Sequence, residues 1–552
     1  MKKTLLSLTL VALLAIGCTK TLDLAPQDTI SDATFWKTDA DYKLAANNLY
    51  FSLDGFNFND VQSDMAYSTG DDVSKGTYQP GTTDGNWSNS YVYIRQANVI
   101  INKGAGSDNA GIKRFVAEAK FFRAYNYFRL LRLFGGVPLQ TVAVDPSDNQ
   151  LYAPRASRKE VADLILKDLT EAAADLPDKK ALANNDVGRI SKGAADGFRA
   201  RVALFEGTWG KYRNDANATA YLDQAISAAS TVISSGQFAL FTGKGPQSYR
   251  YLFIEEGDDS QESMIDRRYQ RDIARQAFPY SIDQTGYLAT KKLADSYLCD
   301  DGLPVSKSPK FQGYDKFTSE YQNRDPRMTM TLIVPGTKTV RPFNPTPVEN
   351  WPNNPQRNAN TGYITYKYLS EDDFGNRIGN NGNTNSYDNR VLRYAEVLLI
   401  LAEALWEKNG SISDADLDRT INALRTRAGL TARLSNAFAA ANGLNLRDEI
   451  RRERTVELAL EGYRYDDLRR WKTAEVELPQ DIKGIKIKGS EWATRPPYNG
   501  AAYQARTDAN GFLIVEPASA RFFDANKHYL RPLPLREISL YPNNTLTQNP
   551  GW

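Results

Sequence analysis

Apolar residues recur along much of the chain at the three- and four-residue spacing of amphipathic helices. One stripe, between residues 391 and 405, consists of Val391, Ala395, Leu398, Ala402 and Leu405. The next stripe follows Asp414, a potential helix cap, and consists of Leu417, Ile421, Leu424 and Ala428. Because residues three and four apart share one face of a helix, the two stripes predict two adjacent helices with apolar faces.

Three further pairs of helical segments are predicted before this one. The first pair covers 39–52 and 87–102, the second 112–134 and 160–176, and the third 190–209 and 222–233. Ala and Gly lie between the large apolar residues of these segments, which suits the close packing of repeated helix pairs. The predicted fold is therefore mainly α, a tetratricopeptide-like helical-repeat scaffold of about four helix pairs.

Two stretches interrupt the helical pattern. Residues 241–389 and 474–552 are rich in Pro, Asn, Gly and Tyr and contain few long periodic runs. This composition predicts loops and short strands. We interpret the first stretch as a loop-rich variable module that carries ligand-binding residues, because such residues often lie on loops held by a rigid frame. The second stretch is expected to pack on the scaffold.

The N-terminus has the pattern of a bacterial lipoprotein signal. Lys2 and Lys3 precede an apolar run at 5–16, which is short for a membrane span but suits the core of a signal peptide. The run ends in Ala-Ile-Gly before Cys18 and is similar to a lipobox, in which the cysteine is acylated and becomes the first mature residue. Each buried acyl CH₂ contributes about 0.8 kcal/mol, so several chains would anchor Cys18 firmly. An ordinary secretory signal with an incidental cysteine is the alternative.

These observations divide the chain into six parts. A signal peptide at 1–17 and a lipidated tether at 18–31 precede helical repeats at 32–240, the variable module at 241–389, further helical repeats at 390–473 and the loop-rich C-terminal segment at 474–552. No later run of about 18 apolar residues occurs, so we expect the body of the protein to lie outside the bilayer.

Charge and composition exclude some function classes and favour others. The formal net charge is +2, and removal of Lys2 and Lys3 with the signal peptide leaves the chain neutral. Nucleic-acid-binding proteins carry a basic excess, so we expect no nucleic-acid partner. Aromatic residues reach 11%, with 30 Tyr and 8 Trp. Their rings can stack on sugar faces, although Tyr also packs well in loops for structural reasons.

Five sequence motifs span the chain. They lie at 116–139, which ends in Phe-Gly-Gly-Val-Pro-Leu, and at 391–404, 421–430, 449–471 and 529–552. In this order they resemble the SusD/RagB family of bacterial glycan-capture lipoproteins. The resemblance implies four tetratricopeptide-like helix pairs with a variable region, attachment to the outer membrane facing the cell exterior, and an oligosaccharide cargo. It also implies a partner, a TonB-dependent outer-membrane barrel of the SusC type over which the protein sits as a lid.

One of these motifs contains a dense run of charges at 449–457. Acidic and basic residues alternate there at helical spacing, as they do in ion-pair networks between helices. We therefore expect this run to hold the fold together and not to contact cargo.

Catalytic and metal-binding patterns are scarce. His528 is the only histidine, which excludes two-histidine zinc sites, and no Gly-x-Ser-x-Gly or Walker pattern accompanies it. We interpret Cys299 as a buried apolar residue. The acidic pair Asp71-Asp72 and the run 255–259 lack the alternating ligands of a calcium loop, so no cofactor is predicted and a structural Ca²⁺ is left open.

The function predicted from these observations is non-catalytic capture of a glycan. A surface glycoside hydrolase is an alternative, because glycoside hydrolysis needs only two carboxylates and the chain has 66 Asp and Glu residues. Capture of a peptide by the same architecture is another.

Candidate ligand-binding residues come from two regions. In the loop before the second predicted helix, Trp87 is expected to act as a stacking platform, with Tyr78 beside it and Asp64 or Asp71 as a hydroxyl acceptor. Further candidates from the variable region and its end are Tyr287, Trp351, Tyr363 and the donor Arg390.

Overall fold

A computed structural model describes residues 35–144, 149–270, 273–282, 287–336, 338–341, 344–349, 360–369 and 385–552. The predicted signal peptide and tether, including Cys18, lie outside the described residues, and so does Trp351. The predicted division of the chain into six parts stays a prediction.

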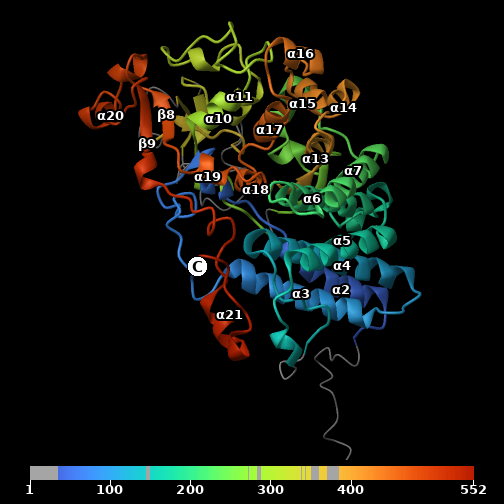
Figure 1. Cartoon of the computed structure of the whole chain (residues 1–552). Coiled ribbons are helices and arrows are strands. Elements are labelled where there is room, and N and C mark those ends of the chain that lie inside the picture. The colour runs from blue at the N-terminus through green and yellow to red at the C-terminus, as the bar shows by residue number, and fades with distance from the viewer. Residues whose placement is uncertain are drawn as a thin grey trace, which may run out of the picture.

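The N-terminal half is a stack of helices that follow one another in space as in sequence (Figure 1). They are α2 (Asp39–Leu49), α3 (Gly85–Lys103), α4 (Ala110–Phe134), α5 (Arg158–Asp175), α6 (Lys192–Lys211) and α7 (Ala218–Ser234). Each helix packs on the next from α3 to α7, and α2 packs on α3 and α4. The three predicted pairs are therefore confirmed.

Helix α4 lies at the centre of this stack. It contacts α2, α3 and α5, and 18 of its 25 residues are buried. Asn109 caps its N-terminus by accepting hydrogen bonds from the backbone N–H groups of Gly111 and Ile112. Gly135 ends it with φ of 78°, a conformation that favours glycine.

The fourth helix pair is less regular than the sequence predicts. The first predicted helix is α13 (Tyr394–Asn409), and the second is divided into α14 (Asp414–Arg419) and α15 (Ile421–Ala428). Two further helices, α17 (Leu446–Glu457) and α18 (Arg464–Arg470), follow. Val391 is not helical, because strand β7 (Asn389–Arg393) pairs with β2 (Ser263–Arg267) before α13 begins. The second stripe breaks at Thr420, whose φ and ψ of −121° and −87° separate α14 from α15. Ser413, not Asp414, caps α14.

The remaining strands are short and antiparallel. Strands β1 (Ala66–Tyr67), β3 (Leu288–Ala289) and β6 (Tyr363–Ile364) form one sheet, while β4 (Lys338–Arg341) pairs with β5 (Asn344–Glu349) and β8 (Ile482–Lys486) with β9 (Phe512–Glu516). Short helices lie between the strands along the chain: α8 (Ser248–Tyr251), α9 (Phe278–Ser281), α10 (Lys291–Ser296), α11 (Arg327–Thr331), α16 (Asn436–Ala441), α19 (Ala474–Glu477) and α20 (Ala501–Ala505). The last helix, α21 (Leu535–Leu540), follows β9. The predicted mainly α fold with short strands is confirmed.

This loop-rich part has an apolar core of its own. The core combines rings and aliphatic side chains from the first loop, the middle of the chain and the C-terminal segment, among them Met65, Tyr249, Tyr287, Leu332, Tyr363 and Trp492. Sheet β1-β3-β6 lies at this junction, because β1 comes from the loop after α2 while β3 and β6 come from the middle of the chain. The module is therefore tied to the scaffold by backbone hydrogen bonds.

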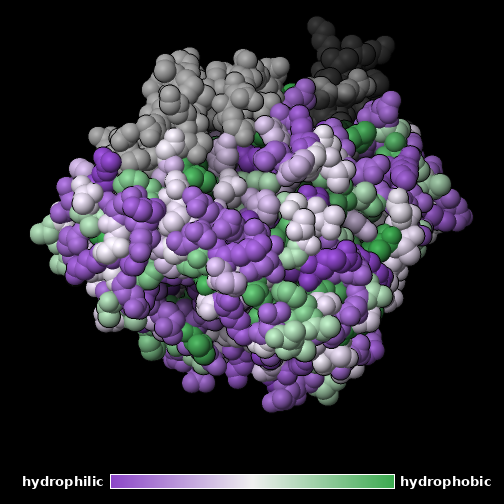
Figure 2. Space-filling model, turned by 90° about the horizontal axis from the view of Figure 1, so that it is seen from above, coloured by the Kyte–Doolittle hydropathy of each residue, from purple (hydrophilic) through white to green (hydrophobic). Residues whose placement is uncertain are grey.

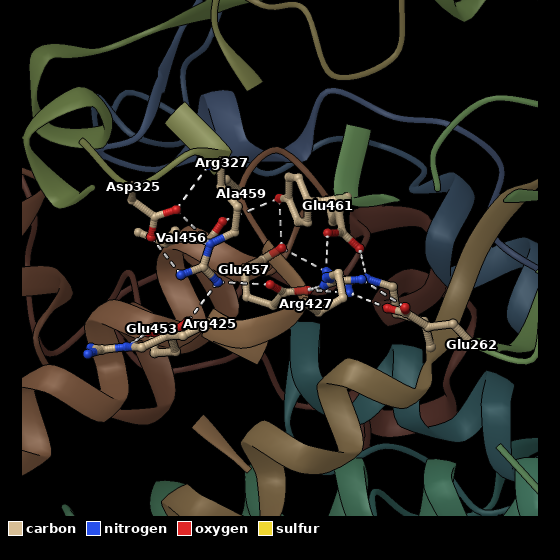
Figure 3. A network of polar contacts seen from close by, with 12 residues as sticks. Glu262, Asp325, Arg327, Arg425, Arg427, Glu453, Val456, Glu457, Ala459 and Glu461 are labelled. Atoms are coloured by element: carbon tan, nitrogen blue, oxygen red, sulfur yellow. Dashed lines mark hydrogen bonds and ion pairs between the residues drawn. The ribbon is translucent and has the colours of Figure 1, made fainter. Parts of the chain in front are cut away.

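A buried network of charges joins the two parts (Figure 3). Glu457 of α17 receives hydrogen bonds from Arg327 of α11 and Arg393 of β7, at 2.9 and 2.7 Å. Arg427 of α15 bridges Glu457 and Glu262, the residue that precedes β2. The interpretation of the run 449–457 as an ion-pair network is confirmed, and its partners extend into the loop-rich module.

The surface is mixed in character. Figure 2 shows hydrophilic residues over most of one face, with hydrophobic residues scattered among them. No helix in the described ranges has both the length and the apolar character needed to cross a bilayer.

Candidate ligand-binding site

An aromatic groove lies between α3 and the C-terminal segment around α21. Its volume is about 320 Å³, within the range of small-molecule sites. The lining residues are Trp87, Tyr91, Ile94, Arg95, Asn98, Gln140, Val142, Val144, Leu151, Tyr152, Glu537, Leu540 and Tyr541. They come from helix α3, the segment after α4 and the C-terminal part of the chain, which Figure 1 shows next to the helical stack.

Two pairs of rings define the groove. On α3, the centroids of Trp87 and Tyr91 lie 5.2 Å apart, and the ring of Phe134 meets Trp87 edge-on at 5.3 Å. On the other side, the rings of Tyr152 and Tyr541 are nearly perpendicular, with centroids 5.6 Å apart. The planes of Trp87 and Tyr91 are tilted by 48°, whereas Phe134–Trp87 and Tyr152–Tyr541 are edge-to-face contacts, which are favourable and help to orient the rings.

Local structure explains why Trp87 faces this groove. Asp84 caps α3 by accepting a 2.7 Å hydrogen bond from the backbone N–H of Asn86, so Trp87 lies in the first helical turn. Its side chain is only 4% exposed and forms the floor of the groove. Tyr91, one turn later, donates a 2.8 Å hydrogen bond to the carbonyl of Pro138. The helical segment predicted from residue 87 thus begins at Gly85. The ring of Trp87, which we expected to act as a stacking platform, is buried and leaves little of its face for a ligand.

The accessible surface of the groove belongs to other residues. Tyr152 is 42% exposed and Leu540 is 52% exposed. Arg95 and Glu537 supply a cation and a carboxylate, and neither forms an ion pair with another described residue. The buried side chain of Asn98 is fully used, since its Nδ2 donates to the carbonyls of Gln140 and Val142. The groove thus offers rings for stacking, together with one guanidinium and one carboxylate for hydrogen bonds to hydroxyl groups.

The two predicted acceptors serve the fold instead. Asp64 is 3% exposed and binds Arg464 through both carboxylate oxygens, at 2.9 Å each. Lys292 contacts it as well, at 2.9 Å. The prediction that Asp64 offers a free acceptor is therefore wrong. Asp71 accepts a 2.8 Å hydrogen bond from the backbone N–H of Ser74 in a half-buried turn, and its role in binding stays a prediction.

The side chains predicted as ligand-binding residues in the variable region are also buried or engaged by other side chains. Tyr287 and Tyr363 are buried in the core of the loop-rich module, where the Tyr363 hydroxyl donates a 2.8 Å hydrogen bond to Glu320, so neither offers a free ring. Arg390 is 7% exposed and pairs with Asp258 at 3.0 Å. Tyr78 is half-buried, with its ring edge-on to Trp552. These four side chains do not come together in one site with Trp87.

No metal centre is found in the described ranges, where no three His, Cys, Asp or Glu side chains are placed to hold an ion. In the acidic run 255–259, Asp258 pairs with Arg390 and Asp259 with Arg268. A structural Ca²⁺ stays untested. His528 is 8% exposed and packs among Phe522, Phe523 and Trp552, where its Nδ1 accepts a 3.0 Å hydrogen bond from the backbone N–H of Asp524. Burial lowers the pKa of His528, which favours the neutral ring.

Comparison with known proteins decides the family. The model of the SusD family matches residues 252–552, and a second model, described as starch-binding associating with outer membrane, matches residues 26–204. The chain belongs to the SusD family. The resemblance seen in the five motifs is thereby confirmed.

Alignments with other members of the SusD family extend over nearly the whole chain. A SusD-like protein, P2, of Formosa agariphila is 26% identical over the full length of both chains. A SusD-like protein of Bacteroides ovatus is 25% identical and covers all of this chain and 97% of its own. Among solved structures, a SusD-like carbohydrate binding protein from Bacteroides fragilis has a TM-score of 0.74 and 25% identity, covering 91% of this chain and 98% of that one.

Three rings of the groove in this SusD-family protein, Tyr91, Tyr152 and Tyr541, were not among the ligand-binding residues predicted from the sequence. Tyr91 had a usable signal, because it lies four residues after Trp87 in a predicted helix and therefore shares its face. Tyr152 and Tyr541 had none, since 389 positions separate them and only the folded chain brings them together.

Proposed function

We propose that this SusD-family protein captures glycan fragments at the cell surface without catalysis and passes them to a TonB-dependent outer-membrane barrel of the SusC type. The observation that carries the proposal is the aromatic groove between α3 and α21 on a rigid helical scaffold. Paired rings with a few polar groups suit a ligand with flat apolar faces and hydroxyl edges.

The family supports the same proposal. One matching family model is described as starch-binding and associated with the outer membrane, and a structurally similar relative is named a carbohydrate binding protein. An acylated Cys18 would hold the protein at that membrane, facing the exterior, with residues 19–31 as a tether to the scaffold.

A binding panel tests the proposal against its alternatives. Purified full-length protein is titrated by calorimetry with oligosaccharides of different backbone and linkage, and each mixture is assayed for new reducing ends. We expect saturable binding of at least one glycan and no new reducing ends. Release of reducing ends would favour a glycoside hydrolase. Binding of peptides with no binding across the glycan panel would favour peptide capture.

Co-purification tests the transfer step. The protein, extracted in mild detergent from the outer membrane of its own cells, is expected to carry a TonB-dependent barrel with it. Recovery without any barrel, in the presence and absence of the bound glycan, would contradict that part of the proposal and leave the glycan-binding part intact.

A further inference from the structure

One wall of the aromatic groove is the segment 138–144, which follows α4 and is called the wall segment below. Its residues Gln140, Val142 and Val144 line the groove, and Val142 is 42% exposed. After an isolated bridge at Pro138, the wall segment belongs to no helix or strand. The position of this wall therefore depends on contacts from side chains.

Asn98 of α3 binds the backbone of the wall segment. Its side chain is fully buried, and its Nδ2 donates hydrogen bonds of 2.8 and 3.0 Å to the carbonyl groups of Gln140 and Val142. An asparagine amide has donors on one side and an acceptor on the other. It can hold these two carbonyl groups only while its Oδ1 points away from them, towards a donor.

Arg123 of α4 is that donor. Its Nη1 donates a 2.9 Å hydrogen bond to Oδ1 of Asn98 and a 3.1 Å hydrogen bond to the carbonyl of Thr141. Because a guanidinium group cannot accept a hydrogen bond, Arg123 fixes which side of the Asn98 amide faces the wall segment. Two connected side chains thus hold three consecutive carbonyl groups of the wall segment.

Asp168 of α5 orients Arg123 in turn. Its two carboxylate oxygens accept hydrogen bonds of 2.7 Å each from Nε and Nη2 of Arg123, and the two side chains are 1% and 8% exposed. Such a bidentate pair fixes the plane of the guanidinium group. A buried ion pair adds little net stability compared with apolar side chains of the same volume, whereas this one sets the direction of the Nη1 donors.

Tyr127, one turn after Arg123 on α4, adds a third support. Its buried hydroxyl accepts a 2.6 Å hydrogen bond from the backbone N–H of Gln140 and donates one of 3.0 Å to the carbonyl of the same residue. Arg123, Tyr127 and Asp168 are not among the lining residues of the groove. These three side chains therefore act on the wall segment without contacting a ligand in the groove.

We propose that Arg123, oriented by Asp168, is a positioning residue of the aromatic groove, which acts through Asn98 on the wall segment. This role rests on the proposed function, in which the groove binds glycan. A wall that is fixed before the ligand arrives needs no ordering on binding, and a looseness of about 1 Å is enough to impair a binding site. The affinity of the groove therefore depends on a side chain that the glycan does not touch.

Arg123→Lys tests this role. Lysine keeps the positive charge but cannot reproduce the planar fork of donors that binds Asp168, Asn98 and Thr141 together. We expect faster amide hydrogen exchange in the wall segment, measured by mass spectrometry. Under conditions in which the variant is fully folded, we also expect about fivefold weaker binding of the best glycan in calorimetry.

Arg201→Lys on α6 is the matched control. Arg201 also binds a buried carboxylate, that of Glu396, through two nitrogens, and a backbone carbonyl, that of Val391. None of these three residues lines the groove. The control is therefore expected to lower stability without changing the exchange of the wall segment or the affinity for glycan.

Failure of the positioning role and failure of the proposed function give different results. If the wall segment exchanges equally in Arg123→Lys and Arg201→Lys, or if both bind glycan equally while Tyr152→Ala binds weakly, Arg123 is not a positioning residue. If Tyr152→Ala also binds normally, the glycan does not occupy the groove, and both proposals fail. If Arg123→Lys does not fold, Tyr127→Phe removes only the hydroxyl at Gln140, and the same two measurements on it decide.

Discussion

Arg393, the last residue of β7, and Glu457, the last residue of α17, form a buried ion pair with 2.7 Å between Nη1 and Oε1. Both side chains are at most 1% exposed. The same carboxylate also meets Arg327 and Arg427, so a single residue of the helical scaffold connects three segments of the chain (Figure 3). We infer that the attachment of the loop-rich module to the helical scaffold depends on the Glu457 carboxylate.

Glu457→Gln is expected to destabilise the whole protein. Removing one partner of a buried ion pair costs about 3–5 kcal/mol, because the remaining charges are left uncompensated in the protein interior. Here three arginines lose their common acceptor. Chemical denaturation with a global probe measures the change in the free energy of unfolding.

Asp448→Asn on the same helix is the control for this change. Asp448 is 56% exposed and lies 3.5 Å from Arg447, so its loss is expected to change stability by less than about 0.5 kcal/mol. Equal effects of the two substitutions would contradict the assignment of Glu457 as the central residue of the network.

Asp64→Asn separates a structural role from a binding role. Burial would raise the pKa of Asp64, but Arg464 and Lys292 outweigh burial and hold that pKa well below its ordinary value. We therefore expect a loss of about 3 kcal/mol in stability near neutral pH and little change in glycan affinity of the folded fraction. Since the folded pKa is lowered, this contribution is present above the ordinary pKa and disappears as the pH falls. Exposed Asp72→Asn is the control, and a loss of affinity without a loss of stability would restore the original prediction for Asp64.

The helical scaffold was predictable because its signals are local. A stripe such as Leu398, Ala402 and Leu405 needs only a few turns of sequence to be recognised, and α13 has it. Where prediction and structure differ, a non-local contact decided the outcome. Val391 matches the helical stripe, yet it lies in β7 because β2, more than 120 residues earlier, supplies its hydrogen-bonding partner strand.

The binding residues were harder to predict for the same reason. Asp64 looks like a free loop carboxylate until Arg464, 400 positions later, is brought against it. A single sequence shows that the chain has 66 acidic and 68 basic residues, but not which of them form ion pairs. Trp87 was predicted at the start of a helix, but the sequence does not show that its ring is buried against Phe134 of α4.

Glu320 gives the protein a pH-dependent stability. Burial raises the pKa of Glu320 from 4.5 to about 7, and the charge of Asp295 adds to this effect. Because the folded pKa is raised, protonated Glu320 stabilises the fold most below about pH 4.5, and this contribution is lost as the pH rises through about 7. Glu320→Gln keeps an acceptor for the Tyr363 hydroxyl but cannot ionise. In the natural chain the free energy of unfolding is expected to fall by on the order of 3 kcal/mol between these two pH values because of Glu320, and in Glu320→Gln this fall is expected to disappear. Chemical denaturation at a series of pH values measures the difference.

Glu491→Gln controls the sign of this prediction. Lys316 donates a hydrogen bond to the Glu491 carboxylate and holds the pKa of Glu491 below its ordinary value. Replacing this carboxylate by an amide is therefore expected to reduce stability at neutral pH and not in acid. If the free energy of unfolding changed with pH in the same way in Glu320→Gln and in the natural chain, Glu320 would stay ionised when buried, contrary to this prediction.

Cys18→Ala tests the membrane anchor. Without an acylated cysteine the protein is expected to leave the membrane fraction, because no helix in the described ranges can replace the anchor. Labelled palmitate and fractionation of cells measure the change. Cys299→Ala is the matched control, since Cys299 is buried and should not carry lipid. Label retained in Cys18→Ala but lost in Cys299→Ala would refute the lipobox.

Tyr152→Ala tests the aromatic groove more cleanly than any change of Trp87. Trp87→Ala would open a cavity in the core and cost about 3–5 kcal/mol in stability, so lower glycan affinity could reflect unfolding. Tyr152 is 42% exposed, and its truncation should leave the fold intact. Loss of one stacking ring, at about 1 kcal/mol, is expected to weaken the best glycan of the panel five- to tenfold, roughly, in calorimetry.

Two companion variants make this result interpretable. Tyr152→Phe keeps the ring and should retain most of the affinity, whereas Phe51→Ala removes an aromatic ring that is 63% exposed and outside the groove and should retain all of it. If Tyr152→Ala binds as tightly as Phe51→Ala, stacking in the groove does not contribute to capture. The glycan must then bind elsewhere on the protein, even though the rings of Trp87, Tyr91, Tyr152 and Tyr541 meet in one place.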